Sequence, residues 1–307
     1  MNNKIKTRFF RYSGTKHDYT EIVNPLINKS DKNIYVEPFI GSGAILFNLE
    51  KDFDLYVVND IDRNITNIYK TFKEIDYKKF KEIFDTAIKK FTTVDIGFKV
   101  PEKQRTTEIG AQAKENYYNF RNWFNENYWG TDTIEEGVYC MMLANMTINS
   151  MLRFGPNGMN QSWGNRFYIL DERNFNSVKK TLQKTEIYNG DYKILFEKYP
   201  DALFFLDPPY FSQDSSYTAF SEDQFKEFLD IIKDKEYIYT DILNDFNEKI
   251  NSRKLVREMN STSPSTKKQK NGNLEFIFSP LLNIELKNTE IDEDNTNDVN
   301  EIDEDEW

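Results

Sequence analysis

Two short segments carry the residue types that an adenosine-containing cofactor needs. Residues 37–43, EPFIGSG, follow a β-rich run, and their two glycines let the backbone approach a ligand closely. About twenty residues further on, Asn59-Asp60 ends a second β-rich run, where a carboxylate can accept hydrogen bonds from both hydroxyls of a ribose. The spacing is not the GxGxxG or GK[ST] of pyrophosphate-binding loops. The structural alternatives are a plain strand-to-helix turn and an Asp60 or Asp62 that only caps the next helix.

Residues 207–210, Asp-Pro-Pro-Tyr, have the chemistry to hold an exocyclic amine. They follow the apolar run ALFFL, and the two prolines stiffen the turn while leaving backbone carbonyls free to accept. Hydrogen bonds from a heterocyclic amine to Asp207 and to the Pro208 carbonyl would localise the nitrogen lone pair. Stacking on Tyr210 would align that amine with an electrophilic methyl group, so positioning supplies much of the catalysis. The alternative is a rigid turn with a packed tyrosine.

A third segment offers a cation. In residues 10–16, FRYSGTK, an aromatic residue and Lys16 flank a glycine. Beside a cofactor that carries a carboxylate, the Lys16 ammonium supplies an ion-pair partner. On its own, the segment is equally compatible with a surface turn.

The elements that must position these segments alternate between strand and helix. Residues 30–75 are typical of strand, glycine turn, helix, strand and helix, with the helices over residues 44–51 and 64–75. Two further apolar runs, at 185–191 and 202–210, are predicted strands that contain or end near an aspartate. This alternation predicts an α/β fold of parallel strands with crossover helices.

The end of the chain adds three predictions. Ser221 and Gln224 form a capping-box pattern before a helix, and residues 236–242 are a predicted strand. Residues 255–260 and 273–280 indicate a terminal antiparallel hairpin. Between the two α/β parts, residues 76–180 are rich in Lys, Asn and aromatics, with helical stretches at 78–91 and 115–129 and a Gly, Pro and Asn loop at 153–166. We therefore predict a catalytic domain of residues 1–75 and 181–287, an inserted, mainly helical module of residues 76–180, and an acidic disordered tail of residues 288–307.

Composition narrows the class of protein. The 307 residues include one cysteine, Cys140, and one histidine, His17, which excludes an internal disulfide and disfavours zinc sites and Ser-His-Asp chemistry. No run of about 18 apolar residues exists and the start lacks an apolar signal core, so we expect a cytoplasmic protein with no membrane contact. The net charge is −11, but residues 288–307 hold ten acids and no Lys or Arg. Without them, 41 acids face 40 bases, which allows a polyanionic partner.

The motifs YSGTK, EPFIGSG, VVNDID and LDPPY resemble, in order and approximate spacing, those of the DNA adenine-N6 methyltransferases related to Dam. The resemblance covers roughly residues 8–280. It implies a Rossmann-like methyltransferase sheet with an inserted DNA-recognition domain. The implied reaction is methyl transfer from S-adenosylmethionine to adenine N6 in double-stranded DNA, with the adenine flipped out of the stack and no metal.

The resemblance also assigns roles to individual residues. It places around S-adenosylmethionine the residues Tyr12, Lys16, Glu37, Phe39, Gly41, Gly43, Asp60 and Asp191. Asp207 would border both the cofactor and the target base, the Pro208 carbonyl would hold the amine, and Tyr210 would stack on the adenine. These last three residues are the expected catalytic set.

The loop at 153–166 resembles the family's DNA-recognition stretch only in part. Met159 stands where Phe is usual, Ser162 where Pro is usual, and one residue is missing, which bears on the recognised sequence rather than on the chemistry. Arg153 can bind a guanine edge, Arg166 a base or a phosphate, and Asn160 lies in the same loop. An exposed Arg that contacts only phosphate or solvent is the alternative for either arginine. Lys267, Lys268 and Lys270 can follow phosphates or form a solvated loop.

Other functions share these motifs. Cytosine N4 and RNA adenine carry amines that fit the same Asp-Pro-Pro-Tyr chemistry, and a non-catalytic DNA-binding scaffold could keep the fold. The chain order favours DNA adenine, and an intact Asp207, Tyr210, Lys16 and Asp60 favour an enzyme. A cognate restriction endonuclease is a further partner that the resemblance allows, in a bacterium or in a phage-infected cell.

Overall fold

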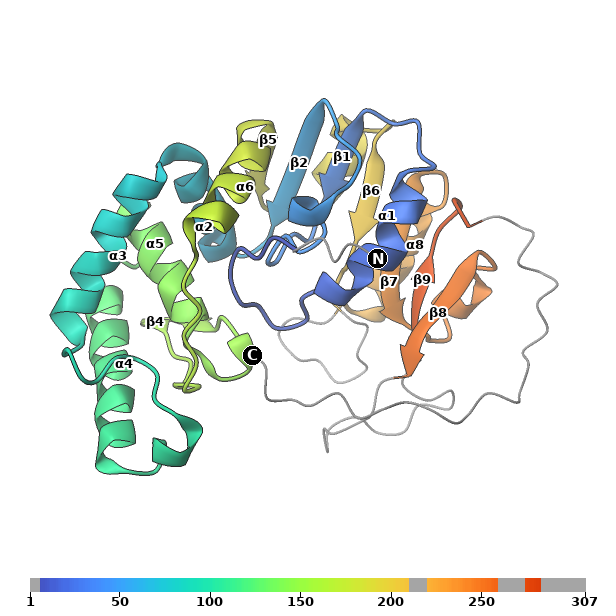
Figure 1. Ribbon diagram of the computed structural model, residues 1–307. Coiled ribbons are helices and arrows are strands. Elements are labelled where there is room, and N and C mark those ends of the chain that lie inside the picture. The colour runs from blue at the N-terminus through green and yellow to red at the C-terminus, as the bar shows by residue number, and fades with distance from the viewer. Residues whose placement is uncertain (1–5, 210–219, 259–273, 283–307) are drawn as a thin grey trace.

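A mainly parallel sheet forms the centre of the computed structural model, which describes residues 6–209, 220–258 and 274–282. Within these residues the sheet has seven strands in the order β5-β2-β1-β6-β7-β9-β8. Its strands are β1 (Ile34–Glu37), β2 (Leu55–Asp60), β5 (Thr185–Asn189), β6 (Leu203–Leu206), β7 (Glu236–Ile242), β8 (Arg253–Glu258) and β9 (Leu274–Phe278). The first five strands in this order are parallel, and β9 runs antiparallel to both β7 and β8. The predicted α/β class and the terminal antiparallel hairpin are confirmed (Figure 1).

Helices cover both faces of the sheet, and alternate strand residues enter two separate cores. Tyr35 of β1 and Phe205 of β6 pack on one face, while their neighbours Val36 and Phe204 pack on the other. Strands that are buried on both faces read as continuous apolar runs, which is why ALFFL was recognisable in the sequence. The first face carries α1 (Thr20–Ile27), α2 (Arg63–Glu74) and α6 (Glu172–Gln183), and the second carries α7 (Lys193–Lys198) and α8 (Glu222–Ile232).

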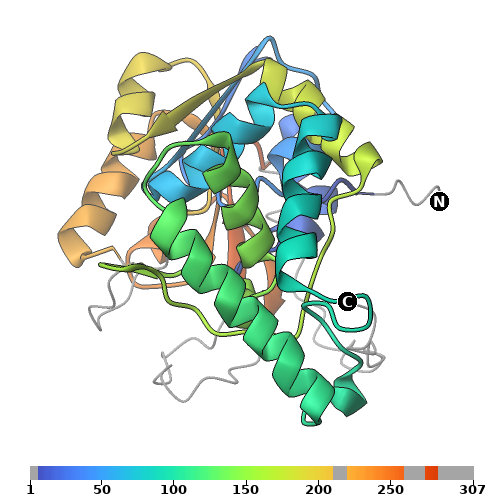
Figure 2. The same ribbon diagram turned by 90° about the vertical axis from the view of Figure 1, so that its left-hand side faces the viewer.

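Apart from α6, which packs on the sheet, the elements of the predicted insert lie beyond the β5 and β2 edge of the sheet and are called the helical module below (Figures 1 and 2). It contains α3 (Tyr77–Phe91), α4 (Glu108–Asn127), α5 (Ile134–Ala144) and a small hairpin of β3 (Phe154–Gly155) and β4 (Gly158–Met159). Its apolar side chains join the first core, which runs without interruption from Tyr35 of the sheet to Phe120 of α4. Short 3-10 turns complete the described residues: η1 (His17–Tyr19), η2 (Leu46–Asn48), η3 (Glu102–Gln104), η4 (Ile148–Ser150) and η5 (Asn247–Lys249).

Local signals in the sequence set several helix ends. The Ser221–Gln224 capping box is present at α8, and Asp62 caps α2 by accepting from the Asn64 N–H at 2.8 Å. The expected helix at 44–51 is wrong, because the chain makes only the turn η2 there. The Asn48 side chain explains this difference. Its Nδ2 donates to the Ala44 carbonyl at 2.9 Å, which is the acceptor that the Asn48 backbone N–H would use in an α-helix, and the same amide bonds the backbone N–H and C=O of Thr7 at 2.7 and 2.9 Å.

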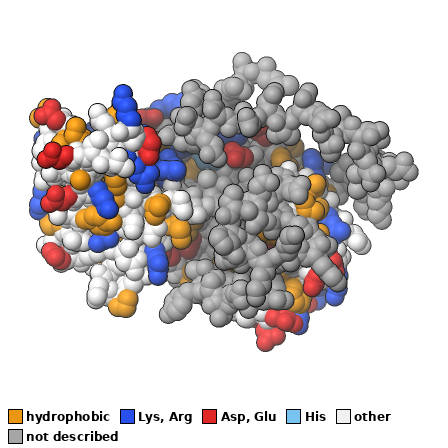
Figure 3. All heavy atoms as spheres, turned by 90° about the horizontal axis from the view of Figure 1, so that it is seen from below, with side chains coloured by type: hydrophobic (Ala, Val, Ile, Leu, Met, Phe, Trp, Pro, Cys, Tyr) orange, Lys and Arg blue, Asp and Glu red, His pale blue; other side chains and the backbone are white. Residues whose placement is uncertain are grey.

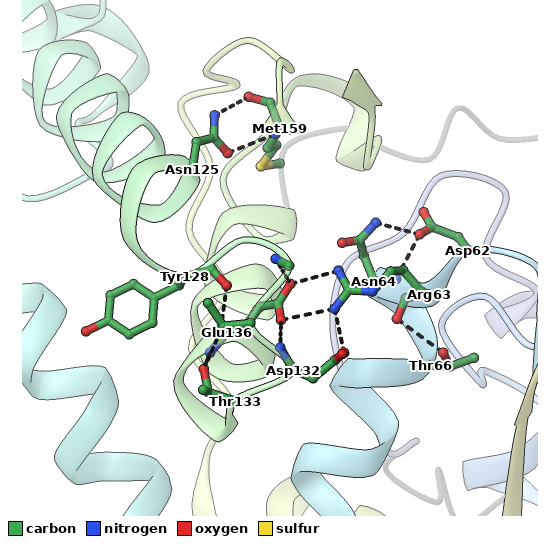
Figure 4. Close-up of polar contacts among 12 residues, drawn as sticks. Asp62, Arg63, Asn64, Thr66, Asn125, Tyr128, Asp132, Thr133, Glu136 and Met159 are labelled. Atoms are coloured by element: carbon green, nitrogen blue, oxygen red, sulfur yellow. Dashed lines mark hydrogen bonds and ion pairs between the residues drawn. The ribbon is translucent and has the colours of Figure 1, made fainter. Parts of the chain in front are cut away.

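An ion pair joins α2 to the helical module (Figure 4). The Arg63 guanidinium at the start of α2 donates to both carboxylate oxygens of Glu136 on α5, at 3.0 and 3.2 Å. The same carboxylate accepts from the backbone N–H groups of Gly130 and Asp132, at 2.8 and 2.7 Å. Only 1% of the surface of Glu136 is exposed. A single side chain therefore fixes the α4–α5 turn and attaches it to the helix that follows β2.

Candidate active site

The predicted motifs meet because β1, β2 and β6 are parallel neighbours. The carboxyl ends of parallel strands lie at one edge of a sheet, so the segments that follow them face a common space. That space is a cavity of about 740 Å³, and it also receives the segment 12–16. Of the predicted cofactor and catalytic residues, its walls include Tyr12, Lys16, Glu37, Phe39, Gly41, Asp60, Asp191, Asp207 and Pro208. Tyr210 lies outside the described residues.

The glycine turn after β1 is shaped by two left-handed glycines. Gly41 has φ +47°, and a Cβ on it would come within 2.9 Å of the Tyr12 ring, so only glycine leaves this wall of the cavity open. Gly43 has φ +67° but does not line the cavity. A Cβ there would meet the Tyr69 hydroxyl at 2.5 Å, and that hydroxyl donates to the Gly41 carbonyl at 3.0 Å. Gly43 therefore lets Tyr69 brace the turn from behind.

Asp60 is held against the glycine turn. Its carboxylate accepts from the backbone N–H groups of Gly41 and Asp62, at 3.2 and 3.0 Å. Burial raises the pKa of Asp60 to about 6. Asn59 beside it donates to the carbonyls of Pro38 and Gly190, both at 3.0 Å, and so ties three strand ends together. The end of β2 thus presents an oriented carboxylate to the cavity.

Glu37 is the most buried carboxyl group of the cavity wall. It is 2% exposed, and the Tyr35 hydroxyl donates to it at 2.7 Å. Burial raises the pKa of Glu37 to about 8, although the Tyr35 hydrogen bond opposes that rise. At neutral pH this carboxyl group is mostly protonated, and a cation placed beside it would favour the ionised form.

Asp207, at the end of β6, is the centre of a small charged cluster. The Lys16 ammonium lies 2.9 Å from its Oδ1, and the Thr240 hydroxyl donates to the same oxygen at 3.0 Å. Burial raises the pKa of Asp207, while Lys16 and Thr240 oppose the rise. Burial alone would lower the pKa of Lys16, but Asp207 and Glu275 outweigh it, so the pKa lies above its ordinary value. Within the described residues Oδ1 holds both contacts, which leaves Oδ2 to accept from a ligand.

Four residues of this site were not predicted from the sequence. Thr240 and Glu275 reach Lys16 and Asp207 from β7 and β9, with Glu275 Oε1 3.8 Å from the Lys16 ammonium. Tyr192 and Phe220 line the cavity beside Phe39, and the Tyr192 ring stacks on the Phe220 ring at 5.7 Å. Thr240 lies within the predicted strand 236–242 and so had a signal, whereas the other three depend on contacts between distant segments.

The predicted DNA-contacting residues lie outside the cavity. Arg153, Asn160 and Arg166 are all exposed, and the Asn160 N–H donates to the Arg153 carbonyl at 3.0 Å. Leu152, which precedes Arg153, lines the cavity, so the hairpin β3–β4 begins at its rim. Burial lowers the pKa of Arg11, and the positive charges of Arg166 and Arg8 lower it further. Lys267, Lys268, Lys270 and the acidic tail fall outside the described residues.

Charge on the described surface is mixed. Figure 3 shows Lys and Arg side chains interspersed with Asp and Glu side chains on the face seen from below. The described residues contain no cluster of three or more His, Cys, Asp or Glu side chains arranged to hold a metal ion. In the same part of the chain, no helix has the length and apolar character needed to span a bilayer.

A family model described as D12 class N6 adenine-specific DNA methyltransferase matches residues 12–290. The chain belongs to this methyltransferase family. The match spans most of the sequence and includes all the cavity segments, so the D12 methyltransferase is an enzyme that methylates adenine N6 in DNA, as the motifs predicted. This match does not favour the alternative functions, which are methylation of cytosine N4, methylation of RNA adenine and a non-catalytic DNA-binding scaffold.

Curated relatives agree with this assignment. The methyltransferase is 28% identical over 236 residues to a Type II methyltransferase, M.MjaIII, of Methanocaldococcus jannaschii, covering 71% of this chain and 75% of that one. It is 25% identical to the Type II methyltransferase M.CviBI of Paramecium bursaria Chlorella virus NC1A, covering 82% and 95%. It is 24% identical to a DNA adenine methylase of Haemophilus influenzae, covering 73% and 72%. A solved precorrin 8W decarboxylase from Methanobacterium thermoautotrophicum superposes with a TM-score of only 0.33 at 9% identity, over 89% of this chain and 97% of that one, which supports no conclusion.

Proposed function

We propose that the cavity of about 740 Å³ holds S-adenosylmethionine and a flipped-out adenine of double-stranded DNA side by side. The observation that carries this proposal is that one cavity is lined both by the glycine turn with Asp60 and by Asp207 with Pro208. The donor set fits the cofactor. Asp60 offers a carboxylate to ribose hydroxyls, and Gly41 keeps open a space that any Cβ would fill. At the amino-acid end, Lys16 offers an ammonium group and Glu37 offers a carboxyl group that a cation would ionise, and Asp191 lies at the same wall for the adenine ring.

Asp207 and Pro208 hold the amine of the target base. Asp207 Oδ2 accepts from one N–H of adenine N6 and the Pro208 carbonyl accepts from the other, which localises the nitrogen lone pair toward the methyl donor. S-adenosylmethionine supplies the electrophilic methyl group when it is bound. As positive charge develops on N6, its proton becomes acidic and leaves to Asp207 or to water. Lys16 and Thr240 keep the Asp207 carboxylate fixed through Oδ1 during this step.

Two measurements test this proposal. Calorimetry should detect S-adenosylmethionine binding to the purified protein. Single-base sequencing of DNA from a methylation-free host that expresses the protein should show N6-methyladenine in one sequence motif. Absence of cofactor binding, or methyl groups on cytosine alone, would overturn the proposal.

The names of two relatives also support a partner. Both are Type II methyltransferases, and on that basis we propose that a cognate restriction endonuclease accompanies this enzyme in the cytoplasm of a bacterium or a phage-infected cell. The expected partner cuts unmodified DNA at the motif that this enzyme methylates and leaves methylated DNA intact. Cleavage of both DNAs by every nuclease encoded nearby would contradict this proposal.

Cofactor binding is expected to release a proton from Glu37. Its pKa is about 8, so the carboxyl group is mostly neutral at pH 7, and a bound cation would ionise it. Affinity should therefore rise as the pH rises toward 8, by up to about tenfold per pH unit, and level off above it. Calorimetry at pH 7 in two buffers of different ionisation enthalpy measures the released protons. Glu37→Gln is the control, because the exchange left in it comes from the cofactor's own amino group and from Asp60 and Asp207, whose pKa values are also raised; equal release in both proteins would refute the role of Glu37.

Arg153 and Arg166 are expected to contact different parts of the DNA, a base edge and a phosphate. Arg153 lies at the hairpin, so Arg153→Ala should relax selectivity at one base position at a cost of about 1–3 kcal/mol. Arg166 belongs to a group of close positive charges that suits a phosphate, so Arg166→Ala should weaken binding to all sequences and reduce the salt dependence by about one counterion. Filter binding across salt concentrations, with cognate and single-base variant duplexes, separates the two signatures. An Arg166→Ala enzyme with an unchanged salt slope would argue against a phosphate contact.

A further inference from the structure

The hairpin β3–β4 is clamped to helix α4 by one side chain. The Asn125 Oδ1 accepts from the Met159 N–H at 2.9 Å, and the Asn125 Nδ2 donates to the Met159 carbonyl, also at 2.9 Å (Figure 4). Both backbone groups of one strand residue are thus satisfied by a single amide. The amide takes the place that a further strand would occupy beside β4.

The neighbouring residues are shaped around this clamp. Gly158 has φ +94°, and a Cβ there would lie 2.5 Å from the Asn125 Oδ1, so the clamp requires glycine before Met159. The Tyr117 hydroxyl and the Arg121 guanidinium of α4 donate to the Gln161 carbonyl, at 2.8 and 3.2 Å. One face of α4, at positions 117, 121 and 125, therefore holds the second half of the hairpin.

The opposite side of the hairpin is open. Met159 is 2% exposed, whereas Arg153 and Asn160 are exposed, as is Asn157 in the turn. The clamp buries one side of β4 and presents these polar side chains outward, next to the cavity rim at Leu152. The hairpin is too short to hold this position alone, because each of its strands has only two residues.

Further contacts link α4 to the part of the molecule that carries Asp60. Helix α4 ends at Asn127, and the turn that follows is fixed by Glu136 through the N–H groups of Gly130 and Asp132. Glu136 is in turn bound by Arg63, one residue after the Asp62 cap. Asn125 is thus attached, through α4 and this turn, to the helix that follows the strand of Asp60.

We propose that Asn125 is a positioning residue for DNA specificity, which sets where the hairpin β3–β4 stands relative to the target base. This rests on the proposed function of the hairpin in DNA recognition. Base edges are read by hydrogen bonds that tolerate little displacement, and a misplacement of about 1 Å can cost on the order of a hundredfold in rate. Asn125 does not line the cavity of about 740 Å³, so its loss should affect the choice of sequence and leave cofactor binding intact.

The test compares variants on both sides of the clamp. Asn125→Ala removes both hydrogen bonds, whereas Asn125→Asp keeps the acceptor for the Met159 N–H and places a second acceptor against its carbonyl. Gly158→Ala pushes a methyl group into the Asn125 amide. Asn127→Ala is the matched control, because Asn127 lies on the same helix but donates to the Trp123 carbonyl of its own helix. For each variant we would measure kcat and KM on the cognate duplex and on single-base variants, cofactor affinity, and melting temperature.

The expected result is a loss of sequence preference without a loss of cofactor binding. Asn125→Ala and Asn125→Asp should lower the preference for the cognate sequence by about tenfold or more, mainly through KM, with cofactor affinity within twofold of wild type and Asn127→Ala unchanged. Gly158→Ala should have the same effect, and its effect in the Asn125→Ala background should be smaller, because the contacts with the Asn125 Oδ1 and Cγ are then absent and only the backbone strain at φ +94° and the contact with Cβ remain.

Two results would overturn the proposal. One is an Asn125→Ala enzyme with wild-type KM and wild-type sequence preference. The other is a parallel loss of melting temperature, cofactor affinity and turnover in both Asn125 variants, which would assign the residue to general folding. Failure of the proposed function is distinguished by measurements on the wild-type protein, which would then bind no S-adenosylmethionine or methylate no sequence motif.

Discussion

Asp207→Ala is expected to reduce the turnover number for DNA methylation by at least about 100-fold, because it removes the acceptor that localises the N6 lone pair and stabilises the charge that develops there. Asp207→Asn should lose nearly as much, since the amide keeps the shape but not the negative charge. Binding to the rest of the duplex should be largely preserved, because the residues proposed to contact it, Arg153, Asn160 and Arg166, lie outside the cavity. Rapid-quench measurement of methyl transfer on a saturating duplex tests this expectation.

The change also affects Lys16, and this must be separated from catalysis. Removal of Asp207 leaves a buried ammonium with its nearest carboxylate gone and Glu275 at 3.8 Å. We therefore expect a lower melting temperature in Asp207→Ala and a smaller decrease in Asp207→Asn. The control is Asp201→Ala, in the exposed turn before the same strand, which should change neither quantity. Near wild-type turnover in a folded Asp207→Ala enzyme would contradict the proposed role of Asp207 as the acceptor for the N6 amine.

Glu136→Ala is expected to lower the free energy of unfolding by about 3 kcal/mol or more. The carboxylate accepts from Arg63 and from two backbone N–H groups, and almost none of its surface is exposed. Its removal leaves the Gly130 and Asp132 backbone N–H groups without their acceptor and leaves Arg63 with only the Asp132 carboxylate, which costs more than the loss of a surface ion pair. Arg63→Ala should cost less, because the arginine is partly exposed and solvent can replace some of its contacts.

Urea denaturation of the two variants measures this difference. Glu135→Ala, on the same turn of α5, is the matched control and should stay within about 0.5 kcal/mol of wild type. A Glu136→Ala protein as stable as Glu135→Ala would show that the ion pair does not hold the helical module to α2.

The parts of the site that were predictable from the sequence are those encoded within a single segment. The glycine turn, Asp60 and Asp207 each follow a recognisable β-rich run, and parallel strands bring their ends to one edge. Ser221 and Asp62 were readable as caps for the same reason, since a cap acts within one helical turn.

Residues that act across the sheet were not predictable in this way. Glu275 reaches Lys16 only because β9 pairs with β7, and nothing in the run NLEFIFSP marks its glutamate as part of a site. Asn125 lies in a helix with many asparagines, and its clamp depends on a hairpin that is 34 residues away along the chain. The failed helix at 44–51 has the same origin, because the Asn48 amide is used by a distant segment.

The contact between α2 and α5 has a consequence for how new target sequences can arise. A Cβ on Gly137 of α5 would lie 2.0 Å from the Thr71 hydroxyl of α2, beside the Glu136–Arg63 pair. A helical module grafted from another enzyme would therefore have to bring both a glycine and a glutamate that match this α2. Hybrid enzymes made by cutting at residues 76 and 180 should fail to assemble unless the module brings these two residues or α2 is transferred with it. Exchange of the hairpin alone leaves that contact untouched, so laboratory evolution of new recognition motifs in this enzyme is better confined to residues 153–160 than spread over the whole insert.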